Sequence, residues 1–199
     1  MSRLITFGCS HTYGEDLNNP EKECWPDQLS NLLKIPLINN GQGGASNRYI
    51  QHSVFNFKFQ KKDTVIILWT YPDRYHFFKN KDNHTGLINV WSESKNSKFW
   101  FKNFRTDYNE KFDNKTIVNQ VNLFLQKKGI SVYNLVVSSE FSYYFDITDC
   151  VIIDLDFDSN FLKKYPKAKD GWHMGSEGHL NFSIAIHRRI INNNLKETI

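Results

Sequence analysis

A serine, an aspartate and a histidine are the residues of this chain whose types and spacing best suit chemistry. Ser10 lies two residues after Gly8, where an apolar run ends, and Asp170 precedes His173 by three residues far downstream. A serine hydroxyl attacks a carbonyl carbon once a base removes its proton, and an imidazole is such a base when a carboxylate fixes its tautomer. The three side chains therefore predict acyl transfer through an acyl-Ser10 intermediate, with His173 first as base and then as acid.

Acyl transfer also needs hydrogen-bond donors for the oxyanion of the tetrahedral intermediate. Backbone N–H groups beside Ser10 and at Gly44, which lies in a glycine-rich segment, can supply two. Loss of one donor of this kind typically raises the barrier by about 3–4 kcal/mol, so the identity of each donor matters.

The elements that position these residues are predicted by apolar runs that alternate with segments of helical spacing. The runs expected as strands are Leu4–Gly8, Leu37–Asn40, Thr64–Trp69, Val132–Val137 and Val151–Leu155. The helical segments are 25–34, a helix capped by Ser46 or Asn47, 114–128, and 177 to 194. Strands alternating with helices indicate right-handed crossovers and a parallel sheet. We therefore expect an α/β fold: a three-layer α/β/α sandwich with a five-stranded parallel sheet in the order 2-1-3-4-5.

This topology brings the chemical groups together. Ligands of an open parallel sheet bind at the carboxyl ends of its strands. Ser10, Gly44 and Thr70 follow the first three strands, and the Asp170–His173 pair precedes the last helix. We therefore expect all of them on one rim of the sheet.

Residues 75–112 interrupt the alternation of strands and helices. The segment is too long for an ordinary connection, and loops of this length are often functional lids. Its aromatic and histidine residues include Tyr75, His76, Phe77, Phe78, Trp91, Phe99, Trp100, Phe101, Phe104 and Tyr108. They can form a satellite hydrophobic cluster, or a stacking wall for a sugar or an apolar acyl chain. We treat the segment as an insertion in a single domain that spans residues 1–199.

Composition excludes several classes of function. The chain has 199 residues, about one domain, and a formal charge of +4 from interleaved charges, so no nucleic-acid partner is expected. No apolar run is long enough to predict a membrane span, and the first residues lack the apolar core of a signal peptide. We therefore expect a cytoplasmic protein without a membrane partner. The abundance of Asn, Lys and Ile is typical of an AT-rich microbial or viral genome, and the sequence gives no indication of oligomeric state.

The cysteines and histidines do not predict a metal site. Cys9, Cys24 and Cys150 are odd in number and lack metal-type spacing, which indicates free thiols in a reduced compartment. The seven histidines show no tight ligand spacing, so we expect no metal and no cofactor. His11, beside the nucleophile, either lines the substrate cleft or is an exposed bystander. His179 is expected to pack or cap near the last helix.

Four segments, in order along nearly the whole chain, resemble the SGNH, or GDSL-type, serine hydrolases. This family includes lipases, acyl thioesterases and carbohydrate O-deacetylases on a flavodoxin-like sheet. The segments are Phe7–Thr12 (nucleophile), Trp25–Leu29 (first helix), Asn39–Ser46 (glycine segment) and Asp170–His179 (the Asp-x-x-His block and its trailing Gly-His). The resemblance implies ester hydrolysis without a cofactor, with an oxyanion N–H on Gly44.

Two positions depart from the family pattern. Cys9 stands where the family has an acidic residue before the serine, and it is either a small buried hydrophobe or, less in keeping with its position, itself a nucleophile. The third block lacks the family's Gly-x-Asn, whose Asn donates to the oxyanion, and Thr70-Tyr71-Pro72-Asp73 stands there instead. Thr70, with Arg74 as a second option, is the expected replacement.

The substrate expected from these features is a small-molecule or carbohydrate ester, with O-acetyl groups on carbohydrate favoured over long-chain lipids. Two alternatives remain on sequence grounds. The missing asparagine favours a non-catalytic glycan-binding or structural module on the same fold. An O-acyltransferase is the other, since a dry site can pass the acyl group to an acceptor other than water.

Overall fold

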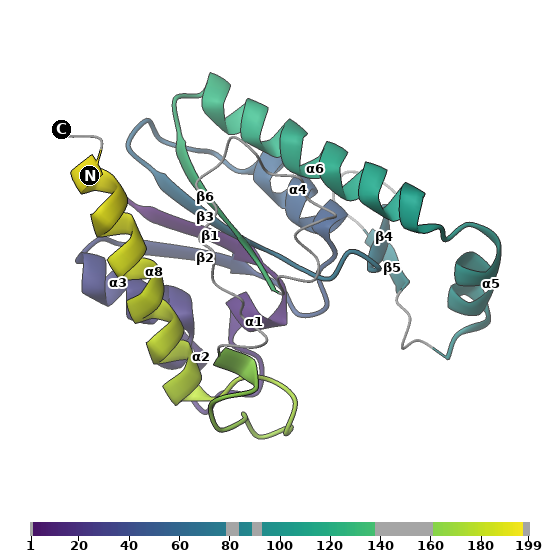
Figure 1. Cartoon of the computed structure of the whole chain (residues 1–199), viewed down its shortest axis with the longest axis horizontal. Helices are drawn as coiled ribbons and strands as arrows, with labels where there is room; N and C mark the ends of the chain where they lie inside the picture. Colours follow the sequence, from purple (N-terminus) through teal and green to yellow (C-terminus); the bar gives the residue numbers. More distant parts are fainter. Residues whose placement is uncertain (1, 79–83, 89–92, 138–160, 197–199) are drawn as a thin grey trace.

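Four parallel strands form the central sheet. The computed structural model describes residues 2–78, 84–88, 93–137 and 161–196, and the backbone alone for 84–88 and 193–196 (Figure 1). The strands are β1 (Leu4–Gly8), β2 (Leu37–Gly41), β3 (Thr64–Trp69) and β6 (Ser131–Val136), hydrogen-bonded in the order β2-β1-β3-β6. The predicted α/β class and the order of the first four strands are confirmed. The expected fifth strand, 151–155, lies outside the described residues.

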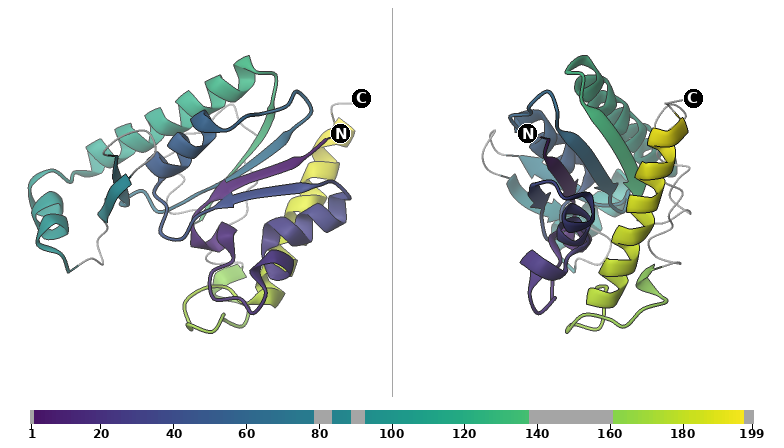
Figure 2. Two further views of the ribbon diagram at one scale, coloured as in Figure 1. Left: turned by 180° about the vertical axis from the view of Figure 1, so that it is seen from behind. Right: turned by 90° about the vertical axis from the view of Figure 1, so that its left-hand side faces the viewer.

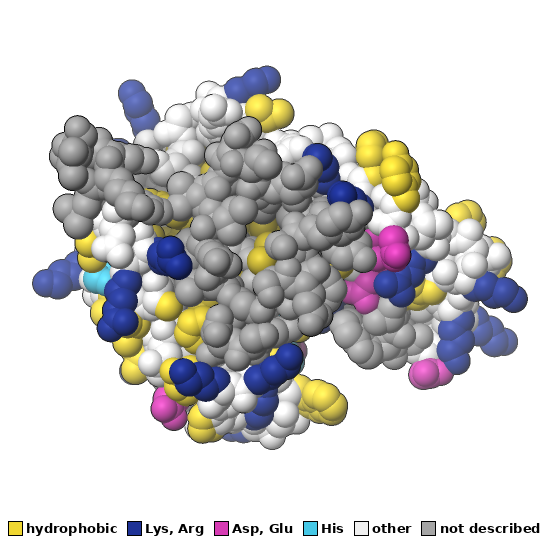
Figure 3. All heavy atoms as spheres, viewed as in Figure 1, with side chains coloured by type: hydrophobic (Ala, Val, Ile, Leu, Met, Phe, Trp, Pro, Cys, Tyr) yellow, Lys and Arg dark blue, Asp and Glu magenta, His cyan; other side chains and the backbone are white. Residues whose placement is uncertain are grey.

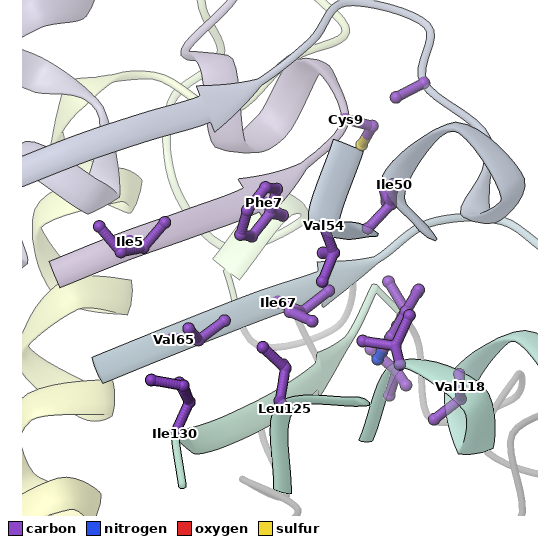
Figure 4. Packing of buried hydrophobic residues seen from close by; sticks show 14 residues of the cluster. Ile5, Phe7, Cys9, Ile50, Val54, Val65, Ile67, Val118, Leu125 and Ile130 are labelled. Atoms are coloured by element: carbon purple, nitrogen blue, oxygen red, sulfur yellow. The ribbon is translucent and has the colours of Figure 1, made fainter. Parts of the chain in front are cut away.

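The strands are apolar because both faces of the sheet are covered. Ile5, Phe7 and Ile67 point into one hydrophobic layer, where Figure 4 shows them with side chains from the covering helices. Leu4 and Leu68 alternate with them and point into the layer on the opposite face. Continuous apolar runs are what a doubly covered parallel sheet requires, so the strand predictions succeed.

Two pairs of helices complete the three layers. α4 (Asn47–Asn56) and α6 (Asp107–Lys127) lie on one side of the sheet, and α3 (Trp25–Leu33) and α8 (Ser176–Lys196) lie on the other (Figures 1 and 2). Ser46 caps α4 by accepting a 3.2 Å hydrogen bond from the Tyr49 N–H, which is one of the two predicted caps. Within the ranges given above, no helix combines the length and the apolar character needed to cross a membrane.

The predicted start of α6 at residue 114 is wrong. The helix begins at Asp107, where the Thr106 hydroxyl accepts a 3.1 Å hydrogen bond from the Asn109 N–H. The first turns carry no apolar stripe, because Tyr108 and Phe112 are exposed there. The residues that these turns bury, Glu110 and Asn114, are polar, so they give no apolar periodicity and only the cap could have indicated the start.

The insertion has secondary structure of its own and is not a plain loop. β4 (Tyr75–Phe78) and β5 (His84–Ile88) form an antiparallel pair, followed by α5 (Lys95–Asn103). The Trp100 ring lies 5.1 Å from that of Tyr75 and 5.3 Å from that of Phe77, measured between centroids. Phe99, Phe104 and Tyr108 of the same insertion are exposed, so both interpretations of its aromatic residues stay open. Trp91 lies outside the described residues.

Candidate active site

The nucleophile candidate stands at a tight turn where β1 ends. Ser10 is the first residue of the short helix α1 (Ser10–Tyr13), which the sequence analysis missed because four residues give no periodic signal. The Cys9 carbonyl accepts hydrogen bonds from the N–H groups of Thr12, at 2.9 Å, and Tyr13, at 3.0 Å. A Cβ on Gly8 would lie 2.0 Å from the Thr12 hydroxyl oxygen, so only glycine allows the chain to turn here. The turn holds Ser10 at the carboxyl end of β1.

The two described cysteines are structural. Cys9 is fully buried and belongs to the hydrophobic layer that also contains Phe7 and Ala45, which confirms the expectation of a small buried hydrophobe. Burial raises the pKa of the Cys24 thiol to about 11, so this group stays protonated. Cys150 lies outside the described residues.

Asn39 is a positioning residue that the sequence analysis did not single out. Its side-chain oxygen accepts hydrogen bonds from the Thr6 hydroxyl, at 3.0 Å, and the Gly41 N–H, at 2.9 Å. Its amide group donates to the Thr12 carbonyl at 2.9 Å. One side chain thus links β1, β2 and α1. A polar Asn-Asn-Gly end on an apolar strand was the available signal.

The Gly44 loop returns to the same edge of the sheet. The Gln42 N–H donates a 3.1 Å hydrogen bond to the carbonyl of Gly8, two residues before Ser10. Gly44 has φ of +71°, a left-handed conformation that glycine adopts without strain. The loop that carries Gly44 therefore begins beside the turn of the nucleophile candidate.

The expected acid–base pair is formed. His173 Nδ1 lies 2.5 Å from Asp170 Oδ2, and Asp170 Oδ1 accepts hydrogen bonds from the N–H groups of Trp172, at 2.9 Å, and His173, at 3.0 Å. Partial burial raises the pKa of Asp170, but these hydrogen bonds outweigh it and lower the pKa to about 2. An ionised carboxylate only accepts, so the proton of a neutral imidazole is on Nδ1 and the lone pair is on Nε2.

Asp16 brings a second carboxylate to the same ring. Its Oδ2 lies 3.7 Å from His173 Nδ1, and its carbonyl accepts a 3.3 Å hydrogen bond from the Lys169 N–H. Potential ligand atoms of Asp16, Asp170 and His173 all lie within 4.8 Å of one another, so these are the residues that could hold a divalent cation. Spacing along the chain could not reveal this cluster, because Asp16 approaches from the loop after α1.

His11, which follows Ser10 in the chain, contacts the ring of the proposed base. Its ring centroid lies 5.2 Å from that of His173, and the residue is buried, so the exposed-bystander alternative is wrong. Burial lowers the pKa of His11 far below its usual value. The positive charges of Arg74 and Lys167 lower it further. His11 is therefore a neutral ring beside Ser10.

Thr70 and Arg74 are joined at the end of β3. The Arg74 guanidinium donates a 3.3 Å hydrogen bond to the Thr70 hydroxyl oxygen, which leaves the hydroxyl proton available for donation. Asn47 holds the Thr70 backbone: its oxygen accepts from the Thr70 N–H at 2.8 Å, and its amide donates to the Thr70 carbonyl at 3.0 Å. The Asn47 amide also donates to the Asn114 side chain at 2.7 Å. The sequence indicated Asn47 only as a possible helix cap and Asn114 only as a helix start.

A cavity opens beside Arg74. It has a volume of about 210 Å³, and its lining includes Asn47, Arg74, Tyr75, Asp113 and Asn114. Most of these side chains carry polar groups, so the cavity suits a small polar group better than an alkyl chain.

Comparisons with known proteins give matches in structure only. No family model matches the chain, and no curated protein is similar in sequence. A member of the lipolytic protein G-D-S-L family from Veillonella parvula DSM 2008 superposes with a TM-score of 0.54 at 11% identity, over 96% of this chain and 97% of that one. An alpha/beta hydrolase enzyme from the metagenome of Lake Arreo, Spain, superposes with a TM-score of 0.61 at 17% identity, over 94% of both chains. This chain has the SGNH/GDSL-type fold.

An acetylxylan esterase from Geobacillus stearothermophilus has the same SGNH/GDSL-type fold. It superposes with a TM-score of 0.60 at 15% identity, over 94% of this chain and 93% of that one. Ser10, Gly44 and Thr70 follow three neighbouring strands of this fold, as expected. His11, beside Ser10, packs its ring against His173 on the loop that also carries Asp170.

His179, the last histidine of the Asp-x-x-His block, supports this SGNH/GDSL-type core. Its ring is 1% exposed, and Nδ1 accepts a 2.9 Å hydrogen bond from the Trp25 N–H at the start of α3. Burial lowers the pKa of His179 to about 3, so the ring stays neutral. The expectation that it packs near the last helix is confirmed.

Proposed function

We propose that this protein hydrolyses small ester groups through an acyl-Ser10 intermediate. The observation that carries the proposal is the hydrogen bond from His173 Nδ1 to ionised Asp170, because it leaves the Nε2 lone pair free to accept a proton. SGNH/GDSL-type neighbours that are described as lipolytic proteins and acetylxylan esterases support the same reaction class.

The reaction has two balanced steps. Ser10 Oγ bonds to the ester carbonyl carbon while its proton passes to His173 Nε2, and the tetrahedral intermediate then expels the alcohol, which takes that proton. Water next attacks the acyl-serine, gives a proton to Nε2, and the carboxylic acid leaves as Ser10 regains its proton. Asp170 remains ionised throughout and offsets the charge of the imidazolium.

The oxyanion is stabilised by donors from three strand ends. The N–H groups beside Ser10 and at Gly44 supply two of them. The Thr70 hydroxyl supplies the third, since Arg74 already donates to its oxygen and directs its proton away. The Arg74 charge also favours a developing anion. Thr70 and Arg74 together thus replace the asparagine that the family resemblance implies.

The substrate favoured is an O-acetyl group on carbohydrate. The cavity beside Arg74 has a volume of about 210 Å³ and a lining rich in polar side chains, which disfavours a long acyl chain. Acetylxylan esterase activity in a neighbour of the same fold points the same way.

Hydrolysis of p-nitrophenyl acetate by wild-type protein and by Ser10→Ala tests the proposal. We expect the substitution to lower kcat by about 10³-fold or more, because no other group here supplies the attacking oxygen. Ser53→Ala, on α4 and away from the rim, is the matched control and should retain wild-type activity. Activity that survives Ser10→Ala would overturn the mechanism. Absence of activity in wild-type protein that binds a glycan would favour the non-catalytic module instead.

A further inference from the structure

The loop that carries the proposed base also carries a cluster of cations and an exposed indole. Residues 161–175 contain four lysines, all exposed: Lys163, Lys164, Lys167 and Lys169. Trp172 lies between Asp170 and His173 in the chain and is 80% exposed. Figure 3 shows lysine and arginine side chains gathered at the lower end of the molecule, where this loop lies in Figure 1. We call the four lysines and Trp172 the basic rim.

The basic rim has a fixed position relative to His173. The Ala168 N–H donates a 2.9 Å hydrogen bond to the His173 carbonyl, and the Gly175 N–H donates one of 2.9 Å to the Pro166 carbonyl. A Cβ on Gly175 would lie 2.7 Å from that same carbonyl oxygen, so the loop closes tightly on itself. A group bound by the rim is therefore held at a set place beside the proposed base.

Lysines outnumber acidic residues in this loop, where Asp170 is already engaged by His173. Among the described residues, none of the four lysines forms an ion pair. Lys167 donates to the Leu162 carbonyl, and Lys164 lies 5.8 Å from the centre of the Tyr165 ring. The charges of Lys167 and Arg74 both act on His11. A substrate that spans this rim meets a positive field.

Trp172 adds an apolar face next to these charges. Tryptophan is enriched at recognition sites, because its large rigid ring offers contact area at little cost in side-chain entropy. Its backbone N–H is used by Asp170, but its ring extends into solvent. A sugar ring presents a flat C–H face to such an indole, while its carboxylate or sulfate substituents can reach the lysines.

We propose that the basic rim binds an anionic polysaccharide whose ester groups the site cleaves. This inference rests on the proposed function and names its substrate class. A membrane surface fits less well, since Trp172 is the only large apolar side chain in the described loop that is strongly exposed, and membrane insertion needs a broader apolar face. A neutral polysaccharide would leave the lysines without a role.

The test compares acetylated polygalacturonate with acetyl xylan, an anionic and a neutral polymer, at equal acetyl content. We expect kcat/KM to be roughly three- to tenfold higher for the anionic polymer at low salt, with the ratio approaching one in about 0.5 M NaCl. The double variant Lys167→Gln, Lys169→Gln should lose most of that ratio. The matched control Lys61→Gln, Lys62→Gln, at the amino end of β3, should keep it.

Binding measurements separate the rim from the chemistry. Unacetylated polygalacturonate should bind wild-type protein several-fold more tightly than the Lys167→Gln, Lys169→Gln variant, whether or not hydrolysis occurs. Trp172→Ala should weaken binding of both polymers and keep the anionic preference. Hydrolysis of p-nitrophenyl acetate with no anionic preference would overturn the rim and leave the proposed function standing. Tighter binding to phosphatidylserine vesicles than to polygalacturonate would also overturn it.

Discussion

Two carboxylates face one imidazole nitrogen in this site. Asp170 accepts a 2.5 Å hydrogen bond from His173 Nδ1, and Asp16 lies 3.7 Å from the same atom. Asp170 was predictable from the sequence, because a spacing of three residues in one loop lets a carboxylate reach the ring. Asp16 was not, because only the folded chain brings the loop after α1 to this position. We therefore expect Asp16 to substitute in part for Asp170 as the carboxylate that orients His173.

Substitution of both carboxylates tests this arrangement. We expect Asp170→Asn to lower kcat for p-nitrophenyl acetate by roughly 10²–10⁴-fold, because the amide can hold the wrong tautomer of His173. Asp16→Asn alone should cost a few-fold, and its effect should grow in the Asp170→Asn background. Glu177→Gln, at the start of α8, is the control for a general change of charge. Equal effects of Asp16→Asn in both backgrounds would contradict the arrangement.

At the scale of elements, the sequence reveals those that bury a long apolar face and misses those that are short or bury polar side chains. β1 and β3 are continuous apolar runs because helices cover both sides of the sheet. α1 is too short to show a helical period, and the first turns of α6 bury polar side chains, those of Glu110 and Asn114. The pairing of β4 with β5 could not be predicted, because their aromatic residues suit a packed cluster and a binding wall equally well.

The junction of α3 with α8 depends on a neutral histidine. The pKa of His179 is about 3 in the folded protein, against 6.5 for an ordinary histidine. Between these values the unfolded chain binds one more proton at this residue, so the free energy of unfolding falls as pH falls below 6.5. From pH 7 to pH 5 this one group accounts for a loss of up to about 2 kcal/mol.

Denaturant unfolding of wild-type protein and His179→Asn at pH 7 and pH 5 measures this effect. The asparagine oxygen can replace Nδ1 as the acceptor for the Trp25 N–H, but it binds no proton. We therefore expect the variant to lose less stability on acidification than wild-type protein does. Buried His11 titrates in both proteins, so it cancels in the comparison. His187→Asn, half-buried on the same helix, should behave as wild type, and an equal acid loss in all three would refute this account.

At the scale of the whole molecule, the site is assembled from distant parts of the chain. Ser10, Gly44 and Thr70 follow three strands that lie side by side, and the ring of His173 packs against that of His11, the neighbour of Ser10 in the chain. The parallel sheet makes this meeting predictable, because its strand ends share one rim. The hydrogen bonds of Asn47 to the Thr70 backbone and to Asn114 were not predictable, since buried amides leave no periodic pattern. Structural neighbours at 11–17% identity share the fold, although most of their residues differ from those of this chain.

Reaction with a fluorophosphonate, followed by peptide mass spectrometry, tests the central claim most directly. The serine oxygen bonds to the phosphorus of an alkyl fluorophosphonate and expels fluoride only where a base takes the serine proton. The account predicts one adduct per chain, on the peptide that contains Ser10, and its loss in His173→Ala. No adduct on folded wild-type protein, or an adduct that forms as fast without the imidazole, would contradict it.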